Sequence, residues 1–154
     1  MLRKHPQTQR GATLIEVLIT LVLLSVGLLG MAGLQALSMQ SNHSAYYRSQ
    51  ATFLAYDIGE RMRTNRSVAL AGGYDVDFPA SSSSNTETGD IASQDKGKWL
   101  NNLADTLPGG TGKVARAGSL ITIQIRWDDS RGDIRSSADL EEKVDVTFKY
   151  ETEI

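Results

Sequence analysis

The chain has 154 residues, of which 40% are hydrophobic and 22% are charged, so its size and composition fit one ordinary domain. Its formal net charge is -2, and it would be -5 without residues 1–11, because Arg3, Lys4 and Arg10 lie there without any acidic residue. That balance argues against nucleic acid as a partner. The absence of cysteine excludes a disulfide framework and thiolate chemistry.

An apolar segment follows the short basic head. No charged residue occurs from Val17 to Leu34, and residues 12–34 are together long enough, at about 1.5 Å per helical residue, to cross a bilayer core of roughly 30 Å. The next basic residue after this segment is Arg48. The positive-inside rule therefore places residues 1–11 in the cytoplasm and the chain after Leu34 on the other side of the membrane.

Glu16 is the only charged residue in this segment. A conventional secretory signal with its cleavage site at Gly30-Met31-Ala32 has a shorter apolar stretch and leaves the carboxylate unexplained. A plain signal anchor accounts for the length but does not account for Glu16. A side chain at the membrane interface that extends to water is a further interpretation. A carboxylate in hydrocarbon is energetically unfavourable, so the presence of Glu16 in this segment needs a specific explanation.

The basic leader, Gly11, the small residue after it and the run Thr13-Leu14-Ile15-Glu16-Val17 resemble the class III signal of type IV pilins and type II secretion pseudopilins. The resemblance implies that a prepilin peptidase cuts between Gly11 and Ala12, which makes Glu16 the fifth residue of the mature chain. It also implies N-methylation of Ala12, although the family usually has Phe there. The family's glutamate is held to pair with the new amino terminus of a neighbouring subunit, which would give a buried carboxylate its partner.

Helical periodicity continues through residues 35–65, which contain no proline. One face carries residues spaced by three or four positions: Tyr47, Ala51, Leu54, Ile58 and Met62. We therefore predict one helix from about Thr13 to about Asn65, roughly 80 Å long at 1.5 Å per residue. Its first half, residues 12–34, lies in the membrane, and its second half supports a periplasmic head formed by residues 35–154.

The sequence after residue 65 predicts a loop followed by a short helix. Residues 66–95 contain Ser81–Ser84 and several turn-forming residues, so they indicate a variable loop, with a short edge strand at Val76 and Phe78 as one interpretation. Lys98–Leu107 has helical spacing and ends before Pro108-Gly109-Gly110. Residues 96–154 are thus expected to hold a short helix and a sheet.

Two segments alternate strictly between apolar and polar residues. Leu120–Trp127 and Val144–Tyr150 predict half-buried antiparallel strands, and Lys113–Arg116 predicts a third strand joined through Gly118. Their apolar faces are the expected partner for the stripe on the long helix. The predicted fold class is α+β, a pilin fold in which a long N-terminal helix packs on a small C-terminal antiparallel sheet.

Two head segments narrow the resemblance to the minor pilins called type IV pilus modification proteins, the PilV group. They are the Leu-Ala-x-Asp…Arg-Met-Arg-x-Asn pattern within Phe53–Arg66, and Trp99…Leu103…Leu107-Pro108-Gly109-Gly110 before a strand that ends in Trp127-Asp128. This resemblance implies a bacterial inner-membrane protein that later enters the pilus fibre, primes pilus assembly and influences twitching motility and adhesion. The implied partners are the prepilin peptidase, other minor and major pilins, the inner-membrane assembly platform and a tip adhesin. A type II secretion minor pseudopilin is the alternative.

The sequence predicts no catalytic, cofactor or metal site. Once the leader is removed, the only histidine is His43, which lies on the membrane-proximal part of the helix, and no nucleophile-base pair or phosphate-binding glycine motif is present. The spacing in the acidic segment 128–142 does not place a glycine and a terminal glutamate where an EF-hand loop has them. A membrane-anchored periplasmic enzyme or binding protein remains the alternative from another functional class.

Overall fold

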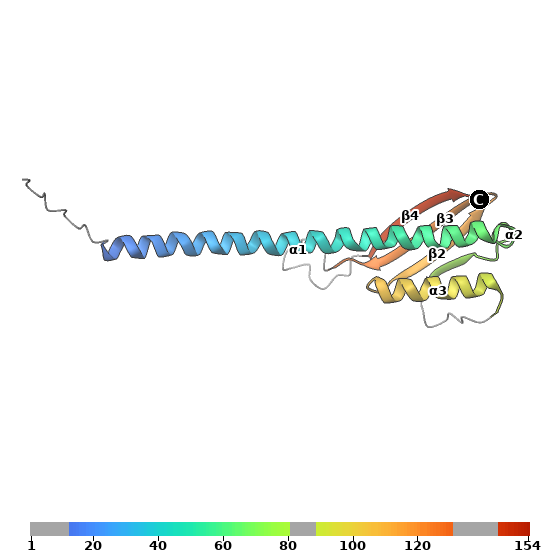
Figure 1. Cartoon of the computed structure of the whole chain (residues 1–154), viewed down its shortest axis with the longest axis horizontal. Coiled ribbons are helices and arrows are strands. Elements are labelled where there is room, and N and C mark those ends of the chain that lie inside the picture. The colour runs from blue at the N-terminus through green and yellow to red at the C-terminus, as the bar shows by residue number, and fades with distance from the viewer. Residues whose placement is uncertain (1–12, 81–88, 131–144) are drawn as a thin grey trace, which may run out of the picture. The chain divides into compact units, whose positions relative to one another are not determined.

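The computed structural model describes residues 13–80, 89–130 and 145–154. The chain divides into two compact units, residues 1–38 and residues 39–154, which are described separately. Helix α1 (Leu14–Thr64) begins in the first unit and ends in the second (Figure 1). The prediction of one helix from about Thr13 to about Asn65 is confirmed to within one residue at each end.

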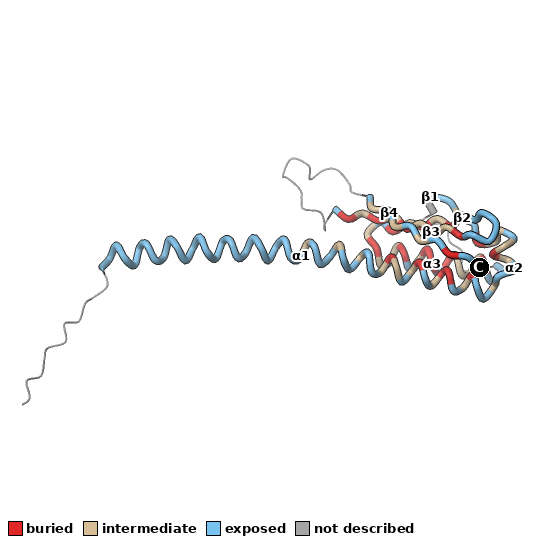
Figure 2. The backbone as a smooth tube through the Cα atoms, turned by 90° about the horizontal axis from the view of Figure 1, so that it is seen from above, coloured by how far each residue is buried: buried red, intermediate tan, exposed pale blue. Residues whose placement is uncertain are grey.

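The first unit, in its described part, consists of Thr13 and α1 as far as Ser38. Every described residue in this unit is exposed (Figure 2). The exposed side chains are large and apolar, and Leu14 is the extreme case at 80% exposure. Within the described part of this unit nothing covers the helix, although its composition is that of a buried or lipid-facing segment.

The second unit contains the remainder of α1, two further helices and a sheet. The helices are α2 (Arg66–Leu70) and α3 (Ile91–Thr106), and the strands are β1 (Val76–Ala80), β2 (Thr111–Ala117), β3 (Leu120–Asp128) and β4 (Asp145–Glu153). In the described residues, the sheet has four strands in the order β1-β2-β3-β4, and each neighbouring pair is antiparallel. The α+β fold with a long N-terminal helix and a small antiparallel sheet is confirmed.

The hairpin between β2 and β3 turns at a glycine. Ala117 pairs with Leu120, so Gly118 and Ser119 form a two-residue connection. Gly118 has a φ of 68°, a left-handed conformation that residues with a side chain rarely adopt, while Ser119 has a negative φ. Glycine at the first position of a two-residue loop is typical of a type II′ hairpin turn. The third strand predicted through Gly118 is therefore present, as β2.

The core lies between one face of the sheet and the helices α1 and α3. The inward side chains of β3 are buried, and they are Ile121, Ile123, Ile125 and Trp127. The predicted apolar stripe of α1 faces this core: Ala51, Ile58 and Met62 are buried, and Tyr47 and Leu54 pack against them as partly buried residues. Figure 2 shows these buried segments in red. The alternation in the strands and the helical spacing in α1 thus meet in one apolar layer.

The short edge strand expected at Val76 and Phe78 is confirmed as β1, but the prediction of a loop over the rest of the described part of residues 66–95 is wrong. These residues form α2, the edge strand β1 and the first turn of α3. Helix α3 begins at Ile91 rather than at Lys98, with Asp90 as its N-cap, where the carboxylate accepts the Ser93 N–H at 2.9 Å. The first turns of α3 are mostly polar, so apolar spacing does not reveal them.

Strand β4 extends three residues beyond the predicted end at Tyr150. Val146, Phe148 and Tyr150 pack partly buried against the core, as their alternation predicts. Val144, the residues Ser81–Ser84 and most of the acidic segment 128–142 lie outside the described residues.

Candidate assembly helix

The first turn of α1 begins next to the predicted cleavage point. The backbone N–H groups of Glu16 and Val17 donate to the Thr13 carbonyl oxygen at 3.0 and 3.2 Å. Glu16 therefore lies in the first turn, where the helix dipole presents its positive end and favours a carboxylate. The start of a regular helix at Leu14 positions Glu16 at the beginning of the apolar segment.

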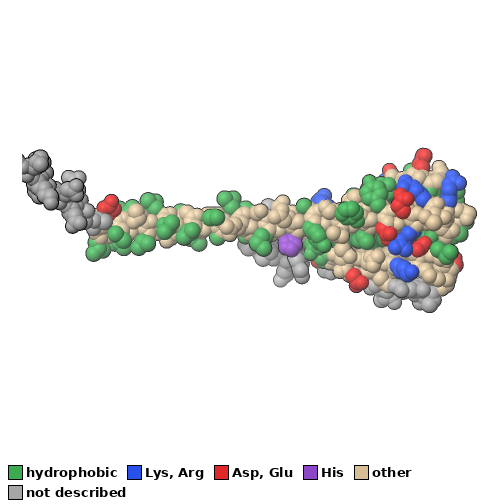
Figure 3. Space-filling model, in the orientation of Figure 1, with side chains coloured by type: hydrophobic (Ala, Val, Ile, Leu, Met, Phe, Trp, Pro, Cys, Tyr) green, Lys and Arg blue, Asp and Glu red, His purple; other side chains and the backbone are tan. Residues whose placement is uncertain are grey.

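The Glu16 side chain is exposed, and within residues 13–80, 89–130 and 145–154 it has no recorded hydrogen bond or ion pair. On the face that Figure 3 shows, hydrophobic side chains cover the first part of α1, and acidic atoms occur there only at its beginning. A single carboxylate in such a surface is unfavourable in a lipid environment unless another chain supplies a positive partner.

Two hydroxyl side chains interrupt the apolar surface, and both are satisfied within the helix. Thr20 Oγ1 donates to the Glu16 carbonyl oxygen at 2.7 Å, and Ser25 Oγ donates to the Leu21 carbonyl oxygen at 2.7 Å. Such bonds to the preceding turn let hydroxyls enter an apolar environment without an unsatisfied donor. Helix α1 is long and apolar enough to cross a membrane.

The leader lies outside the described residues. Arg3, Lys4, Arg10, Gly11 and Ala12 belong to residues 1–12, so of the predicted processing and assembly residues the structure describes only Glu16. The roles of these five residues remain predictions from the sequence pattern.

The head holds the second half of α1 through backbone and close-packing contacts. Trp99 of α3 donates its indole N–H to the Leu54 carbonyl oxygen of α1 at 2.9 Å. Gly59 of α1 is buried where the helix passes over the sheet, and a Cβ there would lie 3.9 Å from both Ile123 Cδ1 of β3 and Tyr150 Cε1 of β4. These contacts make α1 part of the head's core.

A polar cluster joins the end of α1 to α3 and to the segment before β1. Arg61 donates to Asp57 Oδ2 and to Asp95 Oδ1, both at 3.0 Å, and Tyr74 Oη donates to Asp95 Oδ2 at 2.7 Å. Burial of Tyr74 and its bond to Asp95 raise the pKa of the Tyr74 hydroxyl to about 12. Asp95 was not singled out from the sequence, because its partners lie 21 and 34 positions away and leave no local pattern.

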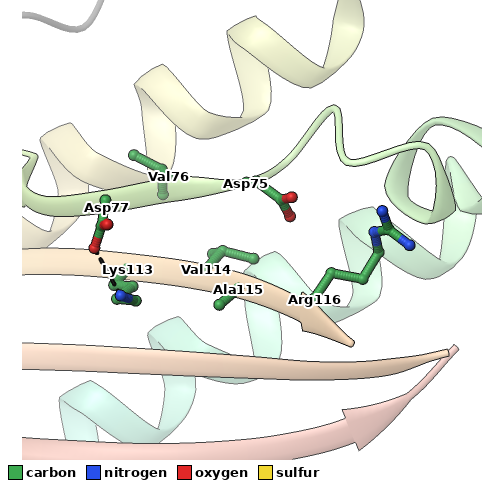
Figure 4. Close-up of a pocket in the computed structure, with 7 residues that line it drawn as sticks. All are labelled: Asp75, Val76, Asp77, Lys113, Val114, Ala115 and Arg116. Atoms are coloured by element: carbon green, nitrogen blue, oxygen red, sulfur yellow. Dashed lines mark ion pairs between the residues drawn. The ribbon is translucent and has the colours of Figure 1, made fainter. Parts of the chain in front are cut away.

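A hollow of about 390 Å³ lies along β1 and β2 (Figure 4). Charged side chains line its two ends: Asp77 pairs with Lys113 at 2.7 Å, and Asp75 and Arg116 lie at the other end. The hydrogen bond from Lys113 lowers the pKa of Asp77 below its usual range. The lining residues include no histidine, serine or threonine, so they do not form a nucleophile-base pair.

A metal centre is also not evident in the part of the chain that the structure describes, where no three His, Asp or Glu side chains gather at a common point. His43 lies beside Tyr47, with ring centroids 6.3 Å apart, rather than beside an acidic cluster. The described geometry therefore offers, as its most distinctive functional feature, the exposed apolar first part of α1 with Glu16 as its one carboxylate.

A comparison with known protein families matches the beginning of α1 and the residues before it. The model of the prokaryotic N-terminal methylation motif matches residues 6–32, which include the second half of the leader, the predicted cleavage point and most of the apolar segment. No curated protein and no solved structure matches the chain. The motif is typical of structural subunits rather than enzymes, and it fits a membrane anchor. Together with the long N-terminal helix on a small antiparallel sheet, the match supports a type IV pilin-like protein with a class III signal peptide.

Proposed function

We propose that this protein is a minor pilin of a type IV pilus that assembles through α1. The observation that carries the proposal is Glu16, a single carboxylate at the start of the exposed, otherwise uncharged apolar segment of α1, inside the matched methylation motif. A structural subunit has a use for such a helix, because neighbouring subunits can cover it.

Assembly follows from the charge that cleavage would create. A cut between Gly11 and Ala12 leaves a positive amine on Ala12, which is also the proposed site of N-methylation. In hydrocarbon an unpaired carboxylate is strongly unfavourable, and pairing with an amine removes much of that penalty. Glu16 therefore favours a position where the amino terminus of a neighbouring subunit meets it, and the apolar surface around it packs at the same time.

The proposed location and partners follow the resemblance to the PilV group. Arg3, Lys4 and Arg10 hold the N-terminus in the cytoplasm, α1 crosses the inner membrane once, and the head lies in the periplasm before it enters the fibre. The prepilin peptidase, the assembly platform, other minor and major pilins and a tip adhesin are the proposed partners. In this role the protein primes pilus assembly and thereby affects twitching motility and adhesion.

A type II secretion minor pseudopilin is the second candidate, because the matched motif serves both machines. Deletion of the gene distinguishes them when surface pili and twitching are scored separately from enzyme secretion. A minor pilin predicts lost or reduced pili with normal secretion. Lost secretion with normal pili would reassign the protein to the secretion machine.

The processing step has a direct test. Intact mass and N-terminal sequencing of the mature protein should show Ala12 as the first residue, and a mass increment of one methyl group would show its methylation. A mature chain that begins at Gly33 would instead identify an ordinary secretory signal.

The role of Glu16 is tested by the isosteric substitution Glu16→Gln. The variant should be cleaved normally but should be depleted from sheared pili, because the amide has no charge to pair with an amine. Asp105→Asn is a matched control, since it also replaces an exposed carboxylate by an amide, but in α3, and leaves α1 unchanged. Normal incorporation of the Glu16→Gln variant would refute the pairing model.

A further inference from the structure

The two edge strands of the sheet differ in how readily another strand can pair with them. Strand β1 is short, it contains Pro79, which has no backbone N–H, and its register with β2 shifts between Val76 and Ala80. Such features protect an edge from further pairing. Strand β4 has none of them: it has nine residues without proline or glycine, and it pairs with β3 without a register shift from Asp145 to Glu153.

The hairpin at Gly118 determines which backbone groups of β4 are on its free side. Ala117 and Leu120 close a two-residue hairpin, so they exchange hydrogen bonds and the backbone of Leu120 points toward β2. The odd-numbered residues of β3 therefore bond to the even-numbered residues of β4, and in the same phase the Ile154 N–H donates to the Ser119 carbonyl oxygen at 3.2 Å. The odd-numbered residues of β4 thus point their N–H and C=O groups away from β3. No described strand pairs with that side, and Figure 1 shows β4 as the last strand there.

The side chains of β4 alternate between two faces. The odd-numbered residues are exposed and mostly charged: Asp145, Thr147, Lys149, Glu151 and Glu153. The apolar residues between them pack against the core but are only partly buried: Val146, Phe148 and Tyr150. A strand added to the free side would cover more of this apolar surface, and it would have to match the charges on the exposed face.

A second copy of β4 matches these charges in an antiparallel register centred on Tyr150. Only the odd-numbered residues have free backbone groups, so they must face odd-numbered residues of the other copy. In this register Lys149 of each copy lies opposite Glu151 of the other, and Thr147 lies opposite Glu153. Within one strand Lys149 and Glu151 already form an ion pair of 2.7 Å, with both side chains about half exposed. Pairing would give each of them a second opposite charge.

The neighbouring registers are less favourable because they bring like charges together. A register centred on Lys149 places the two lysines opposite each other, and one centred on Glu151 does the same with the two glutamates. A register centred on Phe148 places Asp145 opposite Glu151. Like charges directly opposite each other on neighbouring strands are destabilising. The charges of β4 therefore favour one register for a second copy.

We propose that the free edge of β4 is an interaction surface through which two copies of this chain pair, antiparallel and centred on Tyr150. The pairing joins the two sheets into one through main-chain hydrogen bonds, and it brings the two Tyr150 side chains together at the centre. It goes beyond the proposed function and uses only residues of the unit 39–154. Its test is therefore independent of Glu16 and of the assembly machine.

Charge reversal in the full-length protein tests the proposal, with analytical ultracentrifugation in detergent micelles as the measurement. Lys149→Glu and Glu151→Lys should each weaken dimerisation about tenfold, because each places like charges opposite each other twice. An equal mixture of the two variants should dimerise like the original protein, since every reversed side chain then faces an opposite charge. The double variant should do the same. Association through the apolar part of α1 would respond to none of these changes.

Three results would overturn the proposal: an original protein that stays monomeric, single variants that dimerise as well as it does, or a mixture that does not recover. Circular dichroism of each variant checks that the exposed substitutions leave the head folded. A mixture that recovers while both variants alone fail also excludes unfolding as the cause of the loss.

A spin label measures the register directly. The chain has no cysteine, so Thr147→Cys provides a single attachment point on the exposed face of β4. In the proposed register the two labels lie about 20 Å apart, because each is three residues from the centre at about 3.3 Å per residue. Double electron–electron resonance on the full-length dimer should show this distance. A dimer whose distance distribution lacks it would overturn the pairing through β4.

Discussion

Trp99 of α3 donates its indole N–H to the backbone carbonyl of Leu54 in α1 at 2.9 Å, 45 positions earlier in the chain. A helical carbonyl normally accepts from the residue four positions later, so this bond adds a second donor to it. Trp99 is fully buried, and its ring also lies against Gly112 of β2. One side chain thus joins the long helix, the short helix and the sheet.

The head should fold without the apolar segment. Among the described residues, the buried core lies between Ala51 and Trp127, within the unit formed by residues 39–154. We expect a fragment of residues 39–154 to remain soluble and to unfold in one cooperative transition, followed by circular dichroism during urea titration. A fragment without a cooperative transition would show that the head needs the first part of α1 for stability.

Within that fragment, Trp99→Phe should lower the free energy of unfolding by about 2 kcal/mol, from lost packing and a lost hydrogen bond. Trp127→Phe is the matched control, because Trp127 is also buried but its indole N–H has no hydrogen-bond partner among the described residues. The decrease in the free energy of unfolding should be smaller for Trp127→Phe than for Trp99→Phe by about 1 kcal/mol, the usual net value of one hydrogen bond. An equal or larger loss for Trp127→Phe in urea titrations would contradict the assigned role of the Trp99 bond.

Gly59→Ala should raise the stability of the head. Glycine in a helix interior is about 1 kcal/mol less favourable than alanine. The new methyl group would lie 3.9 Å from Ile123 Cδ1 and Tyr150 Cε1, which is ordinary van der Waals contact. We expect a gain of about 1 kcal/mol in the free energy of unfolding.

Gly112→Ala serves as the opposite case. A Cβ at Gly112 would overlap the Trp99 ring and Leu103, both buried, so the substitution should destabilise the head by about 1–3 kcal/mol. The pair tests the packing of the two helices on the sheet at separate points. A loss at Gly59 would show that α1 lies closer to the sheet than described, and no loss at Gly112 would show that α3 lies farther from β2 than described.

The raised pKa of Tyr74 predicts that the head loses stability at high pH. Its pKa is raised from 10.0 to about 12 in the folded state, so the folded state holds the phenolic proton more tightly than the unfolded state does. The resulting stability is complete below pH 10 and falls as the pH rises toward 12. Tyr74→Phe should lower stability near neutral pH by removing the bond to Asp95, and it should reduce the decline between pH 10 and 12. Parallel urea titrations of both proteins measure the difference, and identical slopes above pH 10 would rule out a titration of Tyr74 in this range.

Local pattern alone predicted much of the architecture. The long helix and the stripe of Tyr47, Ala51, Leu54, Ile58 and Met62 follow from spacing within one segment, and the alternation in Leu120–Trp127 identified a strand with one buried face. Periodicity is a property of residues close together in the sequence, so it can be recognised without knowing which other elements the segment packs against. Glu16 was identified in the same way, as a charge where the surrounding residues exclude one.

What the tertiary structure alone decided is which distant residues meet. The polar first half of α3 has no apolar period, and it is a helix because Asp90 caps it and because Asp95 contacts Tyr74 and Arg61. Burial likewise showed which side of α1 the head covers: Tyr47 packs against the core and Tyr46 is exposed, although the two tyrosines are neighbours and look alike in the sequence. Pairings across long sequence separations depend on the packing of the whole head, and no short segment contains that information.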